Sequence, residues 1–151
     1  TLSNEPVTYV NAPLFPQKRG VQIDETRSGE HRDYVNLITV DYGTSEGTTS
    51  ISATIFGSRN PRMVRIDRFE VKAKLEGHLL FCCNRDVPGV VGWMESLLAQ
   101  NNINISDLAL GRESQGGQAI MVINLDTPVP RNVRQQVEGA PNFLWAKQAK
   151  L

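Results

Sequence analysis

The sequence has very few of the residues that staple a fold or hold a metal. Its only cysteines, Cys82 and Cys83, are adjacent, and neighbouring cysteines can neither bridge distant segments nor supply the usual four zinc ligands. The histidines, His31 and His78, are far apart, with no metal-ligand spacing around them. We therefore expect no disulfide and no metal site, and a reducing, cytoplasmic compartment.

The chain also lacks net charge and long apolar runs. It has 16 Lys and Arg against 16 Asp and Glu in 151 residues, so no long-range field favours nucleic acid or an anionic membrane as a partner. No apolar run approaches the roughly 20 residues of a membrane-spanning helix. With 40% apolar and 21% charged residues, the composition is that of a globular protein that could bind a small polar ligand.

Catalytic signatures are missing as well. Ser52, Ser96 and Ser106 lack a nucleophile-elbow sequence, and neither G-x-G-x-x-G nor a Walker pattern is present. The chain opens on Thr1 rather than Met. We expect a non-catalytic piece of a longer protein.

The first half consists of short β-rich segments separated by turn clusters. A short helix is predicted over residues 13–20, and strands over residues 21–23, 34–42, 48–56 and 63–69. In residues 49–56 the alternation places Ile51, Ala53 and Ile55 on one face, which indicates a half-buried strand. The character of the chain changes over residues 71–77.

The second half has alternating strand and helix periods. The pattern predicts strands over residues 79–83, 103–110, 119–125 and 143–149, and helices over residues 90–99 and 130–138. This β-α-β-β-α-β order predicts a ferredoxin-like, four-stranded antiparallel sheet with both helices on one face. The fold class is therefore α+β, with a mixed α/β first domain.

The loop of residues 84–92, between the first strand and first helix of that half, combines two features. A helix N-terminus attracts a carboxylate or phosphate, and Gly89 and Gly92 allow a ligand close to the backbone. Asp86 supplies a negative acceptor. Together they fit a small zwitterion such as an amino acid. The alternative is that Pro88 and Gly89 form only a turn and Asp86 only caps the helix.

These residues carry a family resemblance. Residues 84–92, 102–105 and 110–112 resemble the ACT domain at the C-terminus of the D-3-phosphoglycerate dehydrogenase family. Residues 9–13, 18–20 and 53–57 resemble the allosteric substrate-binding (intervening) domain that precedes it in the longer form of that enzyme. The resemblance divides the chain into an intervening domain, residues 1–76, and an ACT domain, residues 77–151.

The resemblance implies that L-serine binds the ACT domain between two subunits of a homodimer or higher oligomer and inhibits a distant dehydrogenase. The positions that match the effector site are Asn84, Asp86, Pro88, Gly89, Val90, Val91 and Asn104. Asn84 could instead cap a turn, and Asn104 could be a solvated turn residue.

A second site is implied by the same resemblance. Some family members hold a phosphate-bearing anion between the two regulatory domains, and the matching basic residues here are Arg62 and Lys74. A third position, Arg in some members, is Asn124, which removes one positive charge. The alternative is solvated surface charge.

The resemblance places catalysis and the cofactor NAD in domains that this chain does not contain. Two alternatives stay open. One is the related regulatory module of iron-sulfur L-serine dehydratases, which would need cluster cysteines elsewhere. The other is a ligand-free structural dimerisation module.

Overall fold

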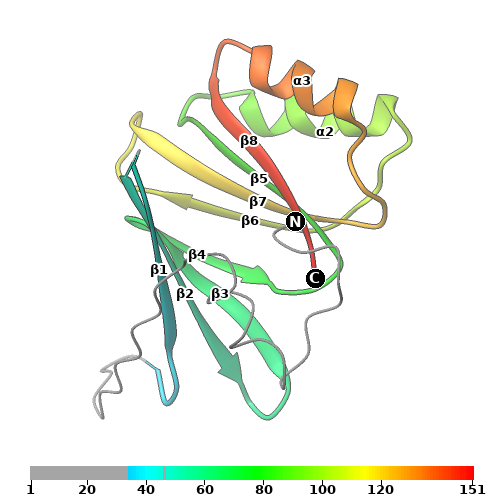
Figure 1. Ribbon diagram of the computed structural model, residues 1–151. Coiled ribbons are helices and arrows are strands. Elements are labelled where there is room, and N and C mark those ends of the chain that lie inside the picture. Colours follow the sequence, from blue (N-terminus) through cyan, green and yellow to red (C-terminus); the bar gives the residue numbers. More distant parts are fainter. Residues whose placement is uncertain (1–33, 46) are drawn as a thin grey trace. The chain divides into compact units, whose positions relative to one another are not determined.

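The structure is a computed structural model that describes residues 34–45 and 47–151. Residues 34–151 form one compact unit, and the described residues contain two four-stranded antiparallel sheets and two helices (Figure 1). The helix predicted over residues 13–20, the strand over residues 21–23, the motifs at 9–13 and 18–20, and His31 lie outside the described residues.

The first sheet is a meander in which neighbouring strands follow one another in the chain. Its order is β1-β2-β3-β4, and the strands are β1 (Ile38–Thr44), β2 (Gly47–Phe56), β3 (Asn60–Ile66) and β4 (Phe69–Lys74). The single strand predicted over residues 63–69 is wrong. Asp67, at φ 50°, turns the chain between β3 and β4, and its carboxylate accepts a hydrogen bond from the Ser50 amide at 2.8 Å.

The burial of β2 also differs from the simplest expectation. The strand is present, but Ile51 and Ile55 are exposed while Ser52 and Thr54 are buried. The buried hydroxyls have partners: Ser52 Oγ lies 2.9 Å from Thr39 Oγ1, and Thr54 Oγ1 donates to the backbone oxygen of Asn36. Satisfied hydroxyls can be buried at little cost, so periodicity alone did not reveal the buried face.

The second half has the predicted element order, with every bound within two residues of the prediction. The elements are β5 (His78–Arg85), α2 (Val90–Gln100), β6 (Ile105–Arg112), β7 (Gln118–Leu125), α3 (Arg131–Gly139) and β8 (Phe143–Lys150). The sheet order is β6-β7-β5-β8, all antiparallel. The protein therefore has the α+β class that the sequence predicted.

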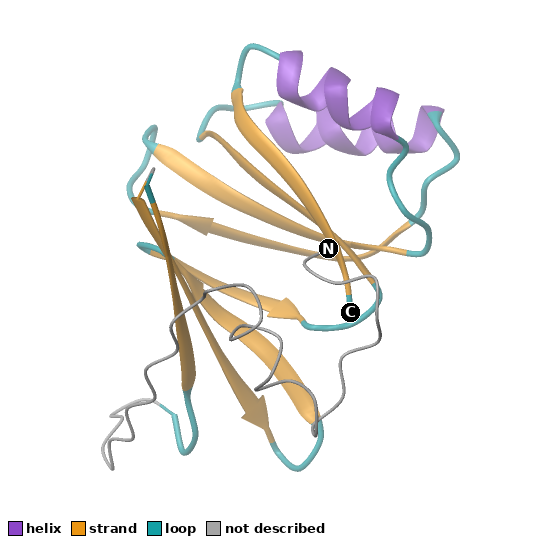
Figure 2. Cartoon of the chain, in the orientation of Figure 1, coloured by secondary structure: helices purple, strands orange, loops and turns teal. Residues whose placement is uncertain are grey.

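Both helices cover one face of this second sheet (Figure 2). Their apolar residues, among them Leu98 and Val133 at 0% exposure, pack on Leu80, Cys82 and their neighbours. Trp93 on α2 also lies against Phe143, with ring centroids 5.2 Å apart. Neither of the described helices is long and apolar enough to cross a membrane.

A second core fills the space between the two sheets. Met63, Ile66, Phe69 and Val71 of the first sheet meet residues of the second, including Cys83, Ile120 and Val122. Strand β4 lies against β6 and β7. Consecutive strand residues face opposite sides, so the two cysteines belong to different cores.

One glycine allows a close approach between the two sheets. A Cβ added at Gly111 on β6 would lie 2.2 Å from the carbonyl oxygen of Glu70 on β4. No side chain can occupy that space without moving one backbone away from the other. Gly111 therefore lets β6 and β4 touch through their main chains.

Candidate functional site

Strand β5 ends at the predicted effector loop and carries Asn84 there. Asn84 lies between Ala119 of β7 and Phe143 of β8 and is 4% exposed. Its Nδ2 donates to the Arg85 backbone oxygen at 2.8 Å, whereas its buried Oδ1 has no hydrogen-bond partner among the described residues. A ligand could reach this oxygen only if the loop opened or the side chain rotated.

Asp86 is held by the hairpin that joins β6 to β7, not by the helix. Its Oδ2 accepts a hydrogen bond from the Gly116 amide at 3.2 Å and lies 3.4 Å from Nη1 of Arg112. The cap of α2 is Gly89, and no side chain caps it. The alternative in which Asp86 only caps the helix is therefore wrong. Its side chain is 29% exposed, so the carboxylate keeps access to solvent.

The N-terminus of α2 lies two residues beyond the exposed segment Val87–Pro88. Gly89 has φ 90°, a conformation that glycine adopts without strain, and its carbonyl accepts the first helical bond from the Trp93 amide at 2.9 Å. The amides of Val90, Val91 and Gly92 precede that bond and have no partner within the helix. Amides that have no partner within the helix and a carboxylate therefore lie on the same loop.

Asn104 lies at the opposite end of the second sheet from Asp86. It immediately precedes Ile105, which pairs with Leu125, while Arg112, the neighbour of Asp86, pairs with Ala119 at the other end of β7. Strand geometry makes this separation on the order of 20 Å. One chain alone therefore does not bring Asp86 and Asn104 together.

The amide of Asn104 is fixed by a reciprocal contact. Its Nδ2 donates to Asp126 Oδ2 at 2.7 Å, and the Asp126 amide donates to the Asn104 carbonyl at 3.2 Å. Because a carboxylate can only accept, this contact engages the amide nitrogen of the exposed Asn104 and not its oxygen. Sequence reasoning missed Asp126, since nothing local signals a partner 22 residues away.

The two predicted anion-site cations do come together. Arg62 and Lys74 are direct register partners on β3 and β4. Both approach Asp107 Oδ2 on β6, Arg62 Nη1 at 4.0 Å and Lys74 Nζ at 3.9 Å.

The third predicted position, Asn124, is buried and serves the backbone. It donates its amide to the carbonyls of Lys74 and Glu76, at 3.3 and 2.9 Å. Sequence reasoning missed Asp107, which pairs with Asn124 across β6 and β7.

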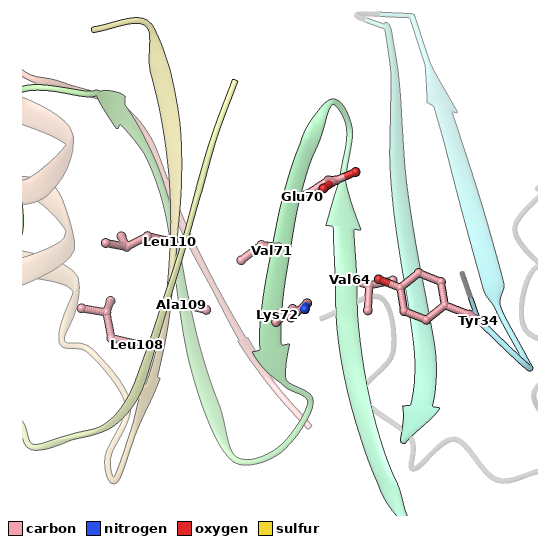
Figure 3. A pocket seen from close by; sticks show the side chains of 8 residues that line it. All are labelled: Tyr34, Val64, Glu70, Val71, Lys72, Leu108, Ala109 and Leu110. Atoms are coloured by element: carbon pink, nitrogen blue, oxygen red, sulfur yellow. The ribbon is translucent and has the colours of Figure 1, made fainter. Parts of the chain in front are cut away.

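A hollow of about 350 Å³ opens between the two sheets. Figure 3 shows Val71 of β4 and Ala109 of β6 facing each other there, while Leu108 and Leu110 point toward the helices. None of the predicted site residues lines it. Within the part of the chain that the structure describes, no group of three or more His, Cys, Asp or Glu could hold a metal ion.

The two thiols are protonated core groups. Burial, with a smaller contribution from Cys83 and Glu138, raises the pKa of Cys82 to about 12. Burial also raises the pKa of Cys83, against the opposing effect of Arg68. Because the thiolate is the nucleophile, neither cysteine is suited to catalysis at neutral pH.

The chain is similar to one family of domains and, over most of its length, to a set of curated proteins. Residues 1–67 match the family model of the D-3-phosphoglycerate dehydrogenase intervening domain. Along 97% of its length the chain is 31% identical to D-3-phosphoglycerate dehydrogenase of Synechocystis, and along 93% it is 29% identical to that of Bacillus subtilis. The enzyme of Methanocaldococcus jannaschii is 30% identical over 91% of the chain.

The chain is therefore a relative of the D-3-phosphoglycerate dehydrogenases, as its motifs indicated. It covers only 26%, 27% and 26% of those three proteins. The chain thus spans about a quarter of the length of the curated relatives it matches.

Proposed function

We propose that this chain is the regulatory region of a D-3-phosphoglycerate dehydrogenase, with an intervening domain in residues 1–76 and an ACT domain in residues 77–151. Its effector is L-serine or another small amino acid. The observation that carries the proposal is that one loop presents both the Asp86 carboxylate and the unpaired amides of α2. The matched relatives, all dehydrogenases of this name, support the same assignment.

The charges on this loop suit the two ends of an amino acid. The ammonium group would bind Asp86 Oδ1, because Oδ2 is already engaged by Gly116 and Arg112. The carboxylate would bind the amides of Val90 and Val91, next to exposed Pro88 and Gly89. Asn84 would join the site after the loop opens, since its free oxygen is buried.

A second copy of the chain would complete the site. Strand β6 is at an edge of its sheet, and an antiparallel pairing of β6 with its copy would bring Asn104 of the partner subunit close to Arg112 and Asp86. Leu110 on β6 is 53% exposed, and an interface there would bury it. Because Asn104 and Asp86 lie far apart within one chain, the complete effector site would require a dimer.

In the whole protein this module would inhibit an NAD-dependent oxidoreductase of serine biosynthesis. The catalytic and NAD-binding groups would belong to parts of the enzyme outside this quarter of it, and we propose a cytoplasmic location. The chain's own residues would bind effector and join subunits, with no role in hydride transfer.

Titration calorimetry with L-serine tests the site. Asp86→Ala should lower serine affinity roughly thirtyfold, because a lost charge-assisted contact costs on the order of 2 kcal/mol. Asp86→Asn should be milder, and Arg62→Gln should leave affinity nearly unchanged. Equal serine affinity in wild type and Asp86→Ala would refute the site, as would a wild-type dimer that does not bind serine.

Sedimentation equilibrium tests the dimer. Leu110→Lys, on the β6 edge, should shift the chain toward monomer, while Leu144→Lys, on the opposite edge strand β8, should not. Leu144 is a matched control because it is also an exposed leucine, at 46% against 53%. A monomeric wild type at high micromolar concentration, with and without serine, would contradict the proposal.

We also propose an anion site at Arg62 and Lys74. The observation in its favour is that both cations approach one point from neighbouring strands. Arginine offers paired donors and lysine a point charge, which together suit a phosphate group. Inorganic phosphate is the simplest probe, and Arg62→Gln should abolish its binding.

A further inference from the structure

Asp107 places one carboxylate oxygen near both cations of the proposed anion site. Its Oδ2 is 4.0 Å from Arg62 Nη1 and 3.9 Å from Lys74 Nζ, so one carboxylate oxygen serves both cations. The three side chains come from β3, β4 and β6, and they carry a net charge of +1. The cation pair is thus already half neutralised by the chain itself.

Backbone packing keeps the main chain of β6 next to β4, so only the side chain of Asp107 can move relative to the two cations. Gly111, farther along β6, touches the Glu70 carbonyl of β4 so closely that no Cβ would fit between them. Asn124, opposite Asp107 on β7, ties the end of β4 to the second sheet through the carbonyls of Lys74 and Glu76. Asp107 is therefore held within reach of both cations.

The contact is nevertheless weak enough to be displaced. Both distances exceed hydrogen-bond length, and the side chains of Arg62, Asp107 and Lys74 are 28%, 34% and 38% exposed. Ion pairs of this kind contribute little to stability because water screens them. A phosphate group that formed direct hydrogen bonds to Arg62 would replace a long contact with short ones.

We propose that Asp107 is a built-in competitor that masks the Arg62 and Lys74 pair and sets its affinity for phosphate-bearing anions. This inference rests on the anion site proposed above. Binding requires the carboxylate to move aside, and the retained negative charge then opposes the bound anion. Asp107 is thereby an autoinhibitory contact of that site.

Calorimetric titration of inorganic phosphate into the full chain, in chloride buffer of constant ionic strength, tests this inference. Asp107→Asn keeps the size of the side chain and removes its charge, and phosphate should then bind about tenfold more tightly. Glu70→Gln is the matched control. It removes a carboxylate that lies 3.9 Å from Arg65 and is 86% exposed, and its phosphate affinity should stay within about twofold of wild type.

The outcomes distinguish the role of Asp107 as a competitor from the existence of the anion site. If Arg62→Gln abolishes phosphate binding but Asp107→Asn binds like wild type, the site exists and Asp107 is not its competitor. If neither wild type nor Asp107→Asn binds phosphate at tens of millimolar, the anion site itself is wrong. Equal gains in Asp107→Asn and Glu70→Gln would mean a general charge effect and would also overturn the inference. Asp107→Ala gives a second variant in case the asparagine perturbs folding.

Discussion

The two sheets bury their side chains in different ways. In the second sheet one face packs on α2 and α3 and the other on the first sheet, so every residue from Ala119 to Leu125 on β7 is buried. In the first sheet β3 and β4 share that inter-sheet core. On β1, by contrast, Ile38 and Val40 are 68% and 60% exposed.

This difference shows that strand periodicity identifies a strand but does not identify its buried face. On β7 the continuous apolar run correctly indicates burial on both sides. On β2 the apolar residues Ile51 and Ile55 are exposed and the hydroxyls of Ser52 and Thr54 are inside. If the helix-covered second half carries most of the stability, substitutions there and at its junction with the first half should cost more than substitutions on β1.

The largest effect is expected where the two sheets touch. Gly111→Ala would place a methyl group 2.2 Å from the Glu70 carbonyl, and the resulting backbone shift should lower the free energy of unfolding by about 3 kcal/mol or more. Urea unfolding measures this loss. Gly139→Ala is the control, because its added Cβ meets nothing within 4 Å. Equal stability of the two variants would mean that the sheets are not in main-chain contact.

A comparison of apolar truncations sharpens the contrast between the regions. Leu98→Ala, in the helix-covered core at 0% exposure, should cost about 3 kcal/mol because it leaves a cavity. Val40→Ala, at 60% exposure, should change stability by less than about 0.5 kcal/mol. Chemical unfolding of both variants provides the test. A cost above about 2 kcal/mol at Val40 would show that another surface covers β1 in solution.

A third effect, negligible at neutral pH and growing only above pH 9, is a pH dependence located in the second half. The folded-state pKa of Cys82 is raised from 9.0 to about 12, so the native state keeps a proton that the unfolded chain releases. This stabilising contribution is complete below pH 9 and is lost as the pH rises toward 12, with a slope approaching about 1.4 kcal/mol per pH unit. Unfolding free energies of wild type and Cys82→Ala across this range should converge. Parallel curves would contradict the burial of this thiol.

Much of the second half could be predicted because its signals are local. The three- and four-residue spacing from Val90 to Leu98 defines α2, and the turn residues around it define its limits. The strand β4 was missed although Phe69, Val71 and Ala73 alternate, because its entry turn contains Asp67 and Arg68 rather than glycine or proline.

The candidate sites were predictable only in part. The loop could be recognised because Asp86 and the start of α2 are close in sequence. The partners of Asp86, Arg112 and Gly116, and the counter-ion Asp107 come from other strands. Such contacts depend on strand register and on how two sheets pack, and no local pattern encodes either property.

The adjacent cysteines of β5 provide a natural pair of probes. One thiol belongs to the helix-covered core and the other to the core between the sheets. Under pulsed alkylation in mild denaturant, each thiol would be modified only when its own layer opens. Without any engineered label, the order in which Cys82 and Cys83 react would therefore report which layer separates first.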